Sequence, residues 1–407
     1  MAAPEAVIVA TARSPIGRAG KGSLTTIRPD DLLGQMISAV LAQVPQLDPA
    51  TIADFLVGCG QPAGEAGFNI ARVVAIQLGL DTVPGTTVNR YCSSSLQTSR
   101  MAHHAIRSGD DEVFVSAGVE TVSRYRAGTA DGWPGTHNPR GAEAEARTAA
   151  RAAGSAEWHD PRSDGLTPDI YIEMGQTAEN VARYCGITRA EMDEFGLLSQ
   201  QRAQQAIADG FWADDITPVV LPDGRVIAAD DGPRTGVTLE GMAALPPVFR
   251  PDGLVTAGNA CPLNDGAAAL VIMSATKAKA LGITPLARIV STAAAAVSPE
   301  IMGLGPVDAS RLALARAGLS IDDIDLVEIN EAFAAQVIPS QRQCGIDPER
   351  LNVFGGAIAI WHPFGMTGAR ITSTLIHGLR ARDKQFGLET MCVAGGQGMA
   401  MVIERLT

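Results

Sequence analysis

Short apolar runs and segments with a helical period alternate along most of the chain. Apolar runs predict strands at residues 7–10, 54–60 and 112–120, and Thr86-Thr87-Val88-Asn89 is predicted to be another extended segment. Apolar residues at helical spacing predict helices between these strands, over 29–41, 69–78 and 94–108. Strands that alternate with helices in this order are typical of an α/β layered fold.

The second part of the chain repeats this order of elements. The pattern predicts strands at 287–291 and 326–330, helices at 306–317 and 369–382, and a strand–turn–strand unit at 391–403. Two pairs of segments also look related, namely 55–60 with 326–331 and 115–120 with 393–398. We therefore expect an internal duplication, with residues 1–275 forming a first half and residues 276–407 a second.

A region of about 121–250 interrupts the first half. Over 124–168 the period is lost among Gly, Ala, Arg, Asp and Pro, and we predict a long loop, of the kind that covers a site or contacts another subunit. Two helices are predicted at 173–185 and 189–209, and short strands and turns follow over 211–250. We expect this region to form an inserted loop domain.

Composition narrows the class of protein. The chain has 407 residues, 46% apolar and 19% charged, which predicts a globular protein of two or three domains. Its net charge of −12 argues against a nucleic-acid partner, which would favour a basic face. No apolar run approaches the roughly 20 residues that span a bilayer, so we expect no membrane segment.

The cysteines and the first residues bear on location. Six cysteines are scattered without a CxxC pair, which excludes a disulfide framework and fits a reducing compartment. No His or Cys pair has metal-ligand spacing, so we expect no metal site. The chain begins without a signal-peptide pattern, and we expect a cytoplasmic protein.

Cys92 is the first candidate for chemistry, because it lies at the start of a predicted helix, directly after an apolar strand. The positive end of the helix dipole and the free backbone N–H groups favour thiolate, the nucleophilic form of cysteine. Ser93, Ser94 and Ser95 are good N-cap residues and support a helix start here. The alternative is a buried structural cysteine, since free cysteines are among the most buried residues.

Three further residues could supply the base and the oxyanion site that a cysteine nucleophile needs. His362 lies in a Gly- and Pro-rich loop that could present an imidazole to a cleft, the alternative being a surface histidine. Cys392 lies at a glycine turn and is either a second reactive thiol or structural. Asn330 ends a predicted strand and could hold an oxyanion-site water, cap the next helix, or do both.

Six local patterns occur together in a fixed order. They are Asn-Arg-Tyr-Cys-Ser-Ser-Ser (89–95), Thr-Ala-Gly-Asn-Ala (256–260), Asn-Asp-Gly-Ala-Ala-Ala (264–269), Asn-Glu-Ala-Phe-Ala (330–334), Gly-Gly-Ala-Ile-Ala-Ile-Trp-His-Pro-Phe-Gly-Met-Thr-Gly-Ala-Arg (355–370) and Cys-Val-Ala-Gly-Gly-Gln-Gly (392–398). Together they closely resemble the thiolase family of acyl-CoA acyltransferases, over residues 7–403. The resemblance implies two βαβαβαββ halves stacked as α-β-α-β-α layers, with a loop domain over the coenzyme A (CoA) site.

The resemblance also implies a ping-pong reaction through an acyl-enzyme. Cys92 would take the acyl group, His362 would activate it, and Cys392 would remove or return a proton at C2 of acetyl-CoA. One oxyanion site would use His362 and a water held by Asn330, and the other the backbone N–H groups of Cys92 and Ala394. No cofactor is implied beyond CoA as a substrate.

Substrate contacts follow from the same motifs. Met174 aligns with a residue of the acyl pocket, and Ala257 and Gly258 with the loop that touches pantetheine. Cys261, which replaces a common Ser, and Phe333 are expected beside them. The small-molecule partners would be acyl-CoA and CoA, whose phosphates basic residues such as Arg234 could contact. The protein partner would be a second copy of the chain, in a homodimer or homotetramer that pairs near 86–89.

Several residues depart from the family pattern. Trp361 stands where Gly precedes the catalytic histidine in the family, and we expect this position to demand a backbone angle that only Gly takes freely. Ala394 also replaces Gly, with the same expected strain, whereas Ser95 in place of Gly should be tolerated. Glu173 stands where short-chain biosynthetic members have His, which argues against an acetoacetyl-CoA-specific enzyme.

Three functions therefore compete. The first is an active 3-ketoacyl-CoA thiolase or acetyl-CoA acetyltransferase, with breakdown of fatty or sterol-derived acyl chains as the default direction. The second is a non-catalytic or impaired acyl-CoA-binding protein, for which Trp361 is the main support. Trp361 itself could be an engineered block, a natural change of the pocket or an inactivating substitution. The third is a ketosynthase-type condensing enzyme, which would lack an equivalent of Cys392.

Overall fold

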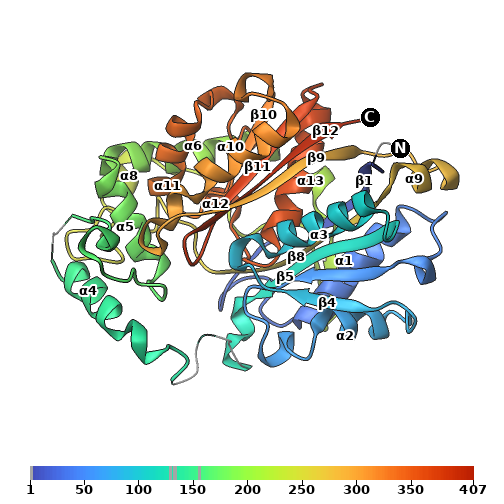
Figure 1. The fold of residues 1–407 in the computed structure, drawn as a ribbon, viewed down its shortest axis with the longest axis horizontal. Coiled ribbons are helices and arrows are strands. Elements are labelled where there is room, and N and C mark those ends of the chain that lie inside the picture. The colour runs from blue at the N-terminus through green and yellow to red at the C-terminus, as the bar shows by residue number, and fades with distance from the viewer. Residues whose placement is uncertain (1–2, 128–130, 132–134, 155–156) are drawn as a thin grey trace.

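A ten-stranded mixed sheet runs through the molecule and consists of two related parts (Figure 1). The computed structural model describes residues 3–127, 131, 135–154 and 157–407. In spatial order the first part contains β4 (Gly85–Val88), β3 (Asp54–Gly58), β5 (Val113–Thr121), β8 (Asn264–Ser274) and β1 (Ala6–Arg13). The second contains β9 (Ala287–Ala296), β12 (Gln397–Arg405), β11 (Phe386–Val393) and β10 (Leu326–Ile329). The tenth strand is β2 (Gly17–Arg18), which pairs with β8, whereas β6 (Val219–Val220) and β7 (Val226–Ile227) form a separate two-stranded sheet.

The two parts share one topology, which confirms the predicted duplication. β3 is parallel to β5 as β10 is parallel to β11, and β8 is antiparallel to β5 as β12 is antiparallel to β11. β1 and β9 meet through only two residue pairs, Val7 with Arg288 and Ile8 with Ala287. The segment pair 55–60 and 326–331 therefore falls on equivalent strands. The pairing of 115–120 with 393–398 is wrong, because β11 is the counterpart of β5 and residues 394–396 form a turn.

Helices form three layers around and between the two parts of the sheet. α1 (Pro29–Ala42) and α2 (Ile70–Gln77) pack their apolar side chains on the outer face of the first part. α3 (Ser94–Ser108) and α13 (Thr367–Ala381) lie between the two parts and bury apolar residues against both. α10 (Gly305–Ala317) and α11 (Ala334–Cys344) cover the outer face of the second. The predicted α-β-α-β-α layering is confirmed.

The region that interrupts the first half contains more helix than the sequence pattern predicts. It includes α4 (Ala142–Ala152), α5 (Met174–Tyr184), α6 (Arg189–Ala208), α7 (Phe211–Asp215) and α8 (Leu239–Ala243). The prediction of a continuous loop over 124–168 is wrong for α4, which protrudes at one end of the molecule (Figure 1). Strong helix formers, with Glu143 and Glu145 in the first turn and Arg151 in the last, explain this helix without an apolar period. The parts of that prediction at 128–130, 132–134 and 155–156 lie outside the described residues.

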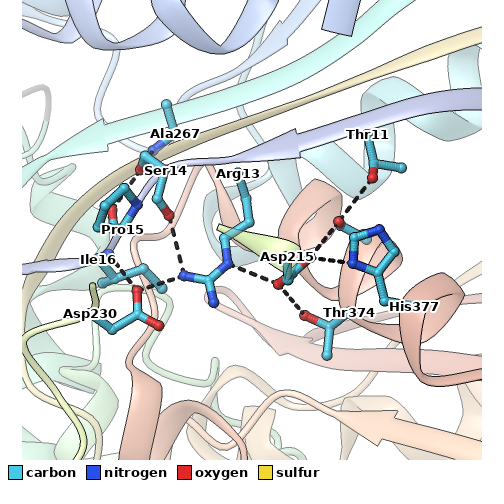
Figure 2. Close-up of polar contacts among 11 residues, drawn as sticks. Thr11, Arg13, Ser14, Pro15, Ile16, Asp215, Asp230, Ala267, Thr374 and His377 are labelled. Atoms are coloured by element: carbon cyan, nitrogen blue, oxygen red, sulfur yellow. Dashed lines mark hydrogen bonds and ion pairs between the residues drawn. The ribbon is translucent and has the colours of Figure 1, made fainter. Parts of the chain in front are cut away.

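A buried ion-pair network fastens this region to the core (Figure 2). The guanidinium of Arg13, at the end of β1, donates to Asp215 at 2.8 Å and to Asp230 on its other side. His377 of α13 lies 3.1 Å from the same Asp215 carboxylate. Burial alone would raise the pKa of Asp215, but the positive charges of Arg13 and His377 hold it well below its usual range. α7 and the 230 loop are thus held against β1 and α13, beneath the cleft described below.

Two short helices complete the description, α9 (Ala275–Leu281) and α12 (Ala357–Ile360). α12 leads directly into the loop that carries His362. Among the described residues, no helix is both long enough and apolar enough to cross a membrane.

Candidate active site

Cys92 lies in a tight turn between β4 and α3. Tyr91–Ser93 form a single 3₁₀ turn, and Tyr91 has a positive φ of 42°, which turns the chain sharply from the strand into the helix. Ser94 holds this turn, because its hydroxyl accepts from the Arg90 backbone N–H at 2.9 Å and donates to the Tyr91 carbonyl at 2.7 Å. α3 begins at Ser94 as predicted, although no side chain caps it. The turn presents Cys92 to a cleft.

The protonation of Cys92 differs from the sequence-based expectation. Burial raises the pKa of the Cys92 thiol to about 12, so burial outweighs the helix end that we expected to favour thiolate. The backbone N–H groups of Cys92 and Ala394 act in the opposite direction and favour negative charge at this sulfur. The resting residue is therefore a thiol, with two backbone N–H groups close to its sulfur.

The hydrogen bonds of His362 determine which ring nitrogen carries the proton. The hydroxyl of Thr367 donates its only hydrogen to the Pro363 carbonyl at 2.7 Å, so it can only accept from Nδ1 of His362. Nδ1 is therefore the protonated nitrogen, and the lone pair of Nε2 is free. Nε2 has no hydrogen-bond partner among the described residues and lies beside the cavity that Cys92 also lines. This is the form of histidine that a general base requires.

Electrostatics keep this imidazole neutral. Burial, and then the positive charge of Arg370, lower the pKa of His362 to about 3. A neutral imidazole and a neutral thiol line the same cavity, so a proton transfer between them would need no preformed ion pair.

Cys392 and Asn330 are buried below the cleft. Neither residue lines the two cavities that meet at Cys92. Cys392 ends β11 and is fully buried, and burial, followed by the proximity of Cys92, raises the pKa of its thiol. Asn330 follows β10 and is also buried, and neither atom of its side-chain amide has a hydrogen-bond partner in the described part of the chain. Buried polar atoms without a partner are uncommon and are typical of groups that serve a ligand or a water.

Two cavities meet at Cys92. One of about 520 Å³ is lined by Met174, Ala257, Cys261, Phe333 and His362, together with Cys92. The other, of about 440 Å³, is lined by Ala394, Met174 and Cys92 together with apolar residues of the 170–172 segment. Gly258 lies one step away, in an adjoining cavity of about 240 Å³ that shares Ala257 and Arg234 with the first. The structure thus brings the predicted substrate residues to one continuous cleft.

Trp361 takes the backbone angle predicted from its place before the histidine. Its φ and ψ are 78° and 179°, a region that essentially only Gly occupies. Its indole is buried, packs on the backbone of Gly232, and lines the adjoining cavity and not the cavity of Cys92 and His362. The side chain therefore points away from the reacting groups, and the non-catalytic function that rested on it is not favoured.

Ala394 and Ser95, two further departures from the family pattern, are accommodated without strain. The expectation of strain at Ala394 is wrong, because the positive φ angles of this turn fall on Gly395 and Gly396, at 78° and 76°. Ser95 fits its buried position, and its hydroxyl accepts from the backbone N–H of Ala369 at 2.9 Å. This bond joins the two central helices, α3 and α13.

Sequence reasoning missed three residues that position the site. Glu120, at the end of β5, is buried and accepts backbone N–H groups from Gly60 at 2.7 Å and from Gly365 at 2.9 Å. It therefore ties the histidine loop to the sheet. Asn264 accepts from the His362 backbone N–H at 3.0 Å, and Thr367 sets the tautomer as described above. Asn264 and Thr367 lie within two of the six motifs, and Glu120 is a polar residue at the end of an apolar strand, but none of the three had been assigned a role.

Comparisons with known proteins agree with this geometry. The family model described as Thiolase, N-terminal domain matches residues 6–276, and Thiolase, C-terminal domain matches residues 283–405. A 3-ketoacyl-CoA thiolase of Bacillus subtilis is 41% identical over 98% of this chain and 99% of its own length. An acetyl-CoA acetyltransferase of Pseudomonas aeruginosa is 44% identical, over 98% and 99%. The crystal structure of the Bacillus anthracis acetyl-CoA acetyltransferase is similar with a TM-score of 0.85 and 39% identity, covering 100% of both chains.

Proposed function

The chain belongs to the thiolase family and is an acyl-CoA C-acyltransferase, and we propose that it works through an acyl-enzyme on Cys92. The observation that carries this proposal is the free Nε2 lone pair of a neutral His362 on the wall of the cavity that also contains Cys92. A buried thiol with a high pKa needs such a base to become a nucleophile at neutral pH.

In the thiolytic direction, the sulfur of Cys92 attacks C3 of a 3-ketoacyl-CoA while Nε2 of His362 takes the thiol proton. The bond between C2 and C3 then breaks, and the thiol of Cys392 delivers a proton to C2, so acetyl-CoA leaves. Protonated Nε2 donates to the thioester oxygen of acetyl-CoA, together with a water held by the amide of Asn330. The acyl group remains on Cys92 as a thioester.

In the second half-reaction, the thiol of CoA attacks the acyl group on Cys92. The Cys392 thiolate takes the proton of CoA, and the departing Cys92 sulfur recovers its own proton from His362. The N–H groups of Cys92 and Ala394 stabilise the oxyanion of each tetrahedral intermediate on Cys92. Every proton has returned to its starting group, so the cycle closes without another cofactor.

The experiment that tests this proposal combines kinetics with mass spectrometry. Incubation with a 3-ketoacyl-CoA and no CoA should add one acyl mass to the protein, on a peptide containing Cys92. Cys92→Ala should abolish the adduct and the turnover. Cys185→Ala, which removes a half-buried thiol that lines neither cavity at Cys92, is the matched control and should retain both. An adduct that persists in Cys92→Ala would refute the acyl-enzyme.

We also propose that the substrates are longer than acetoacetyl-CoA and that degradation, as in β-oxidation, is the working direction. Ile170 and Ile172 line the cavity of about 440 Å³ beside Cys92, together with polar residues such as Gln61 and His137, and the apolar part of this lining suits an extended acyl chain. Glu173 lies where the two cavities meet. A 3-ketooctanoyl-CoA should therefore give a higher kcat/KM than acetoacetyl-CoA, and the reverse ratio would contradict this assignment.

A second copy of the chain is the proposed protein partner, giving a homodimer or homotetramer. β4 ends the sheet in the described part of the chain, so one side of its backbone is free to pair with the β4 of another copy. Phe68, beside this edge, is 97% exposed, and the adjacent Asn69 donates to the Gly85 carbonyl at 2.7 Å and so fixes the Phe68 loop to β4. An aromatic side chain held in water at a free strand edge favours a subunit contact.

For location and cofactors we propose a cytoplasmic enzyme that uses only CoA thioesters and CoA. All six cysteines are free thiols, which suits a reducing compartment. Fractionation of the source cells followed by detection of the protein would test the location. Activity of the purified protein after dialysis against a chelator would test whether any metal is needed.

A further inference from the structure

A large basic cavity lies apart from the cleft at Cys92. Its volume is about 770 Å³, and it shares no lining residue with the three cavities described above. The last two turns of α3, the first half of β9 and the end of α10 form its walls. None of the steps of the proposed reaction uses it.

The charged residues of this cavity are mostly positive, although the chain carries a net charge of −12. Four arginines and one glutamate line it, which gives a formal charge of +3 with histidines neutral. Arg288 pairs with that glutamate, Glu5, and with Glu404. Arg100, Arg107 and Arg316 have no carboxylate partner among the described residues. Three guanidinium groups around one cavity thus lack a counter-charge.

Two adjacent histidines of α3 add to this cluster. His103 is only 5% exposed, lines the cavity, and its Nδ1 has no hydrogen-bond partner within the described ranges. Burial, and then the neighbouring His104 and the arginines on α3, lower the pKa of His103 to about 4. Burial and the charges of Arg100, Arg316 and Arg107 lower the pKa of His104 as well. The cations destabilise one another, and a bound anion would relieve that repulsion.

We propose that this cavity binds a multivalent phosphate anion through Arg100, Arg107 and Arg316. Guanidinium groups match phosphate oxygens with paired N–H donors, and such charge-assisted bonds are stronger than neutral ones. A single carboxylate would leave charge uncompensated, whereas a diphosphate balances the +3 of the lining. The volume is ample for a phosphorylated small molecule. The phosphates belong either to a free polyphosphate or to the nucleotide end of a CoA molecule.

Isothermal titration calorimetry of the full chain with inorganic pyrophosphate tests the site. The double variant Arg100→Gln/Arg107→Gln should weaken binding at least tenfold and leave thiolase turnover unchanged. Arg225→Gln/Arg311→Gln removes the same charge from exposed arginines outside the cavity and is the matched control, expected to bind within twofold of the parent. Arg234→Gln should also bind normally, which excludes the catalytic cleft as the source of the heat. The exposed single change Arg316→Gln gives a second reading if the double variant is unstable.

The ligand source and the protonation of the histidines are tested in the same way. Adenosine 3′,5′-bisphosphate that binds like pyrophosphate would identify CoA as the source, and pyrophosphate alone would identify a free polyphosphate. A bound anion raises the pKa of His103 and His104, so sulfate, whose charge is constant, should bind more tightly as the pH falls from about 7.5 to about 5.5. Besides the three unpaired arginines, only the paired Arg288 and Glu5 face these rings across the cavity.

Two results would overturn the proposal. The first is pyrophosphate affinity in Arg100→Gln/Arg107→Gln that equals that of the parent. The second is a parent protein that binds no pyrophosphate, and a changed sedimentation mass of the double variant would then make the cavity a subunit contact.

Discussion

Replacing the buried Trp361 by Ala and by Gly separates the stabilisation from its side-chain packing from the cost of its backbone strain. Its φ of 78° and ψ of 179° are strained for any residue with a Cβ, at about 1–3 kcal/mol. Its indole is only 3% exposed, and truncating a buried aromatic to Ala costs about 3–5 kcal/mol. Trp361→Ala loses the packing and keeps the strain, so we expect a loss of about 3–5 kcal/mol. Trp361→Gly loses the same packing but releases the strain. About 0.5–1 kcal/mol of the released strain energy is offset, because Gly has more conformational freedom in the unfolded chain. The Gly variant should therefore be more stable than the Ala variant by about 1 kcal/mol.

Urea unfolding of both variants measures this difference, through midpoints compared at equal slopes. Trp212 is the matched control, because it is also 3% exposed but lies in α7 with helical backbone angles. There the order should reverse, with Trp212→Gly less stable than Trp212→Ala by about 1 kcal/mol. The same order at both positions would refute the argument from backbone strain.

The activity of Trp361→Gly tests where the indole points. Because the indole lines the adjoining cavity, the turnover number should stay within about threefold of the parent, provided that His362 keeps its place. A gain of tenfold or more would mean that the indole obstructs the reacting groups, contrary to the structure.

Three further predictions concern stability, pH and assembly. Asp215→Asn should destabilise the fold by about 3–5 kcal/mol in urea, because it leaves the buried charge of Arg13 with less compensation. The lowered pKa of Asp215 means that its stabilisation is present above about pH 4 and is lost as the pH falls further, so below that pH the parent should lose stability more steeply than Asp215→Asn. The lowered pKa of His362 keeps it in the basic form, so kcat/KM should be flat from about pH 8 to about pH 5.5, and an acid limb near pH 6.5 would contradict this. Phe68→Ser should weaken self-association in light scattering without lowering the melting temperature of the fold, and an unchanged dimer would remove Phe68 from the interface.

Local signals in the sequence were enough to predict most of the helices and strands. The apolar period predicted α3 from Ser94 to Ser108, because helix and strand periodicities depend only on which side chains must face a core. The resemblance predicted the backbone angle of Trp361, because the family has Gly at this position and Gly takes positive φ freely. The duplication was visible because each half buries its strands in the same order.

Local signals failed where the result depended on distant contacts. The expected thiolate at Cys92 rested on one helix end, but the sulfur is surrounded by segments from both halves, and their exclusion of water raises its pKa. The tautomer of His362 depends on Thr367, and the loop that carries both is held by Glu120 from another strand.

By itself, then, the sequence determined the layered fold, the duplication and the family, because period and motif are properties of neighbouring residues. Only the tertiary structure decided that Trp361 turns its indole away from the cleft, that Ala394 escapes strain, and that Arg100, Arg107 and Arg316 surround one cavity. Those outcomes depend on burial and on charges that residues far apart in the chain impose on one another, and no local pattern contains them.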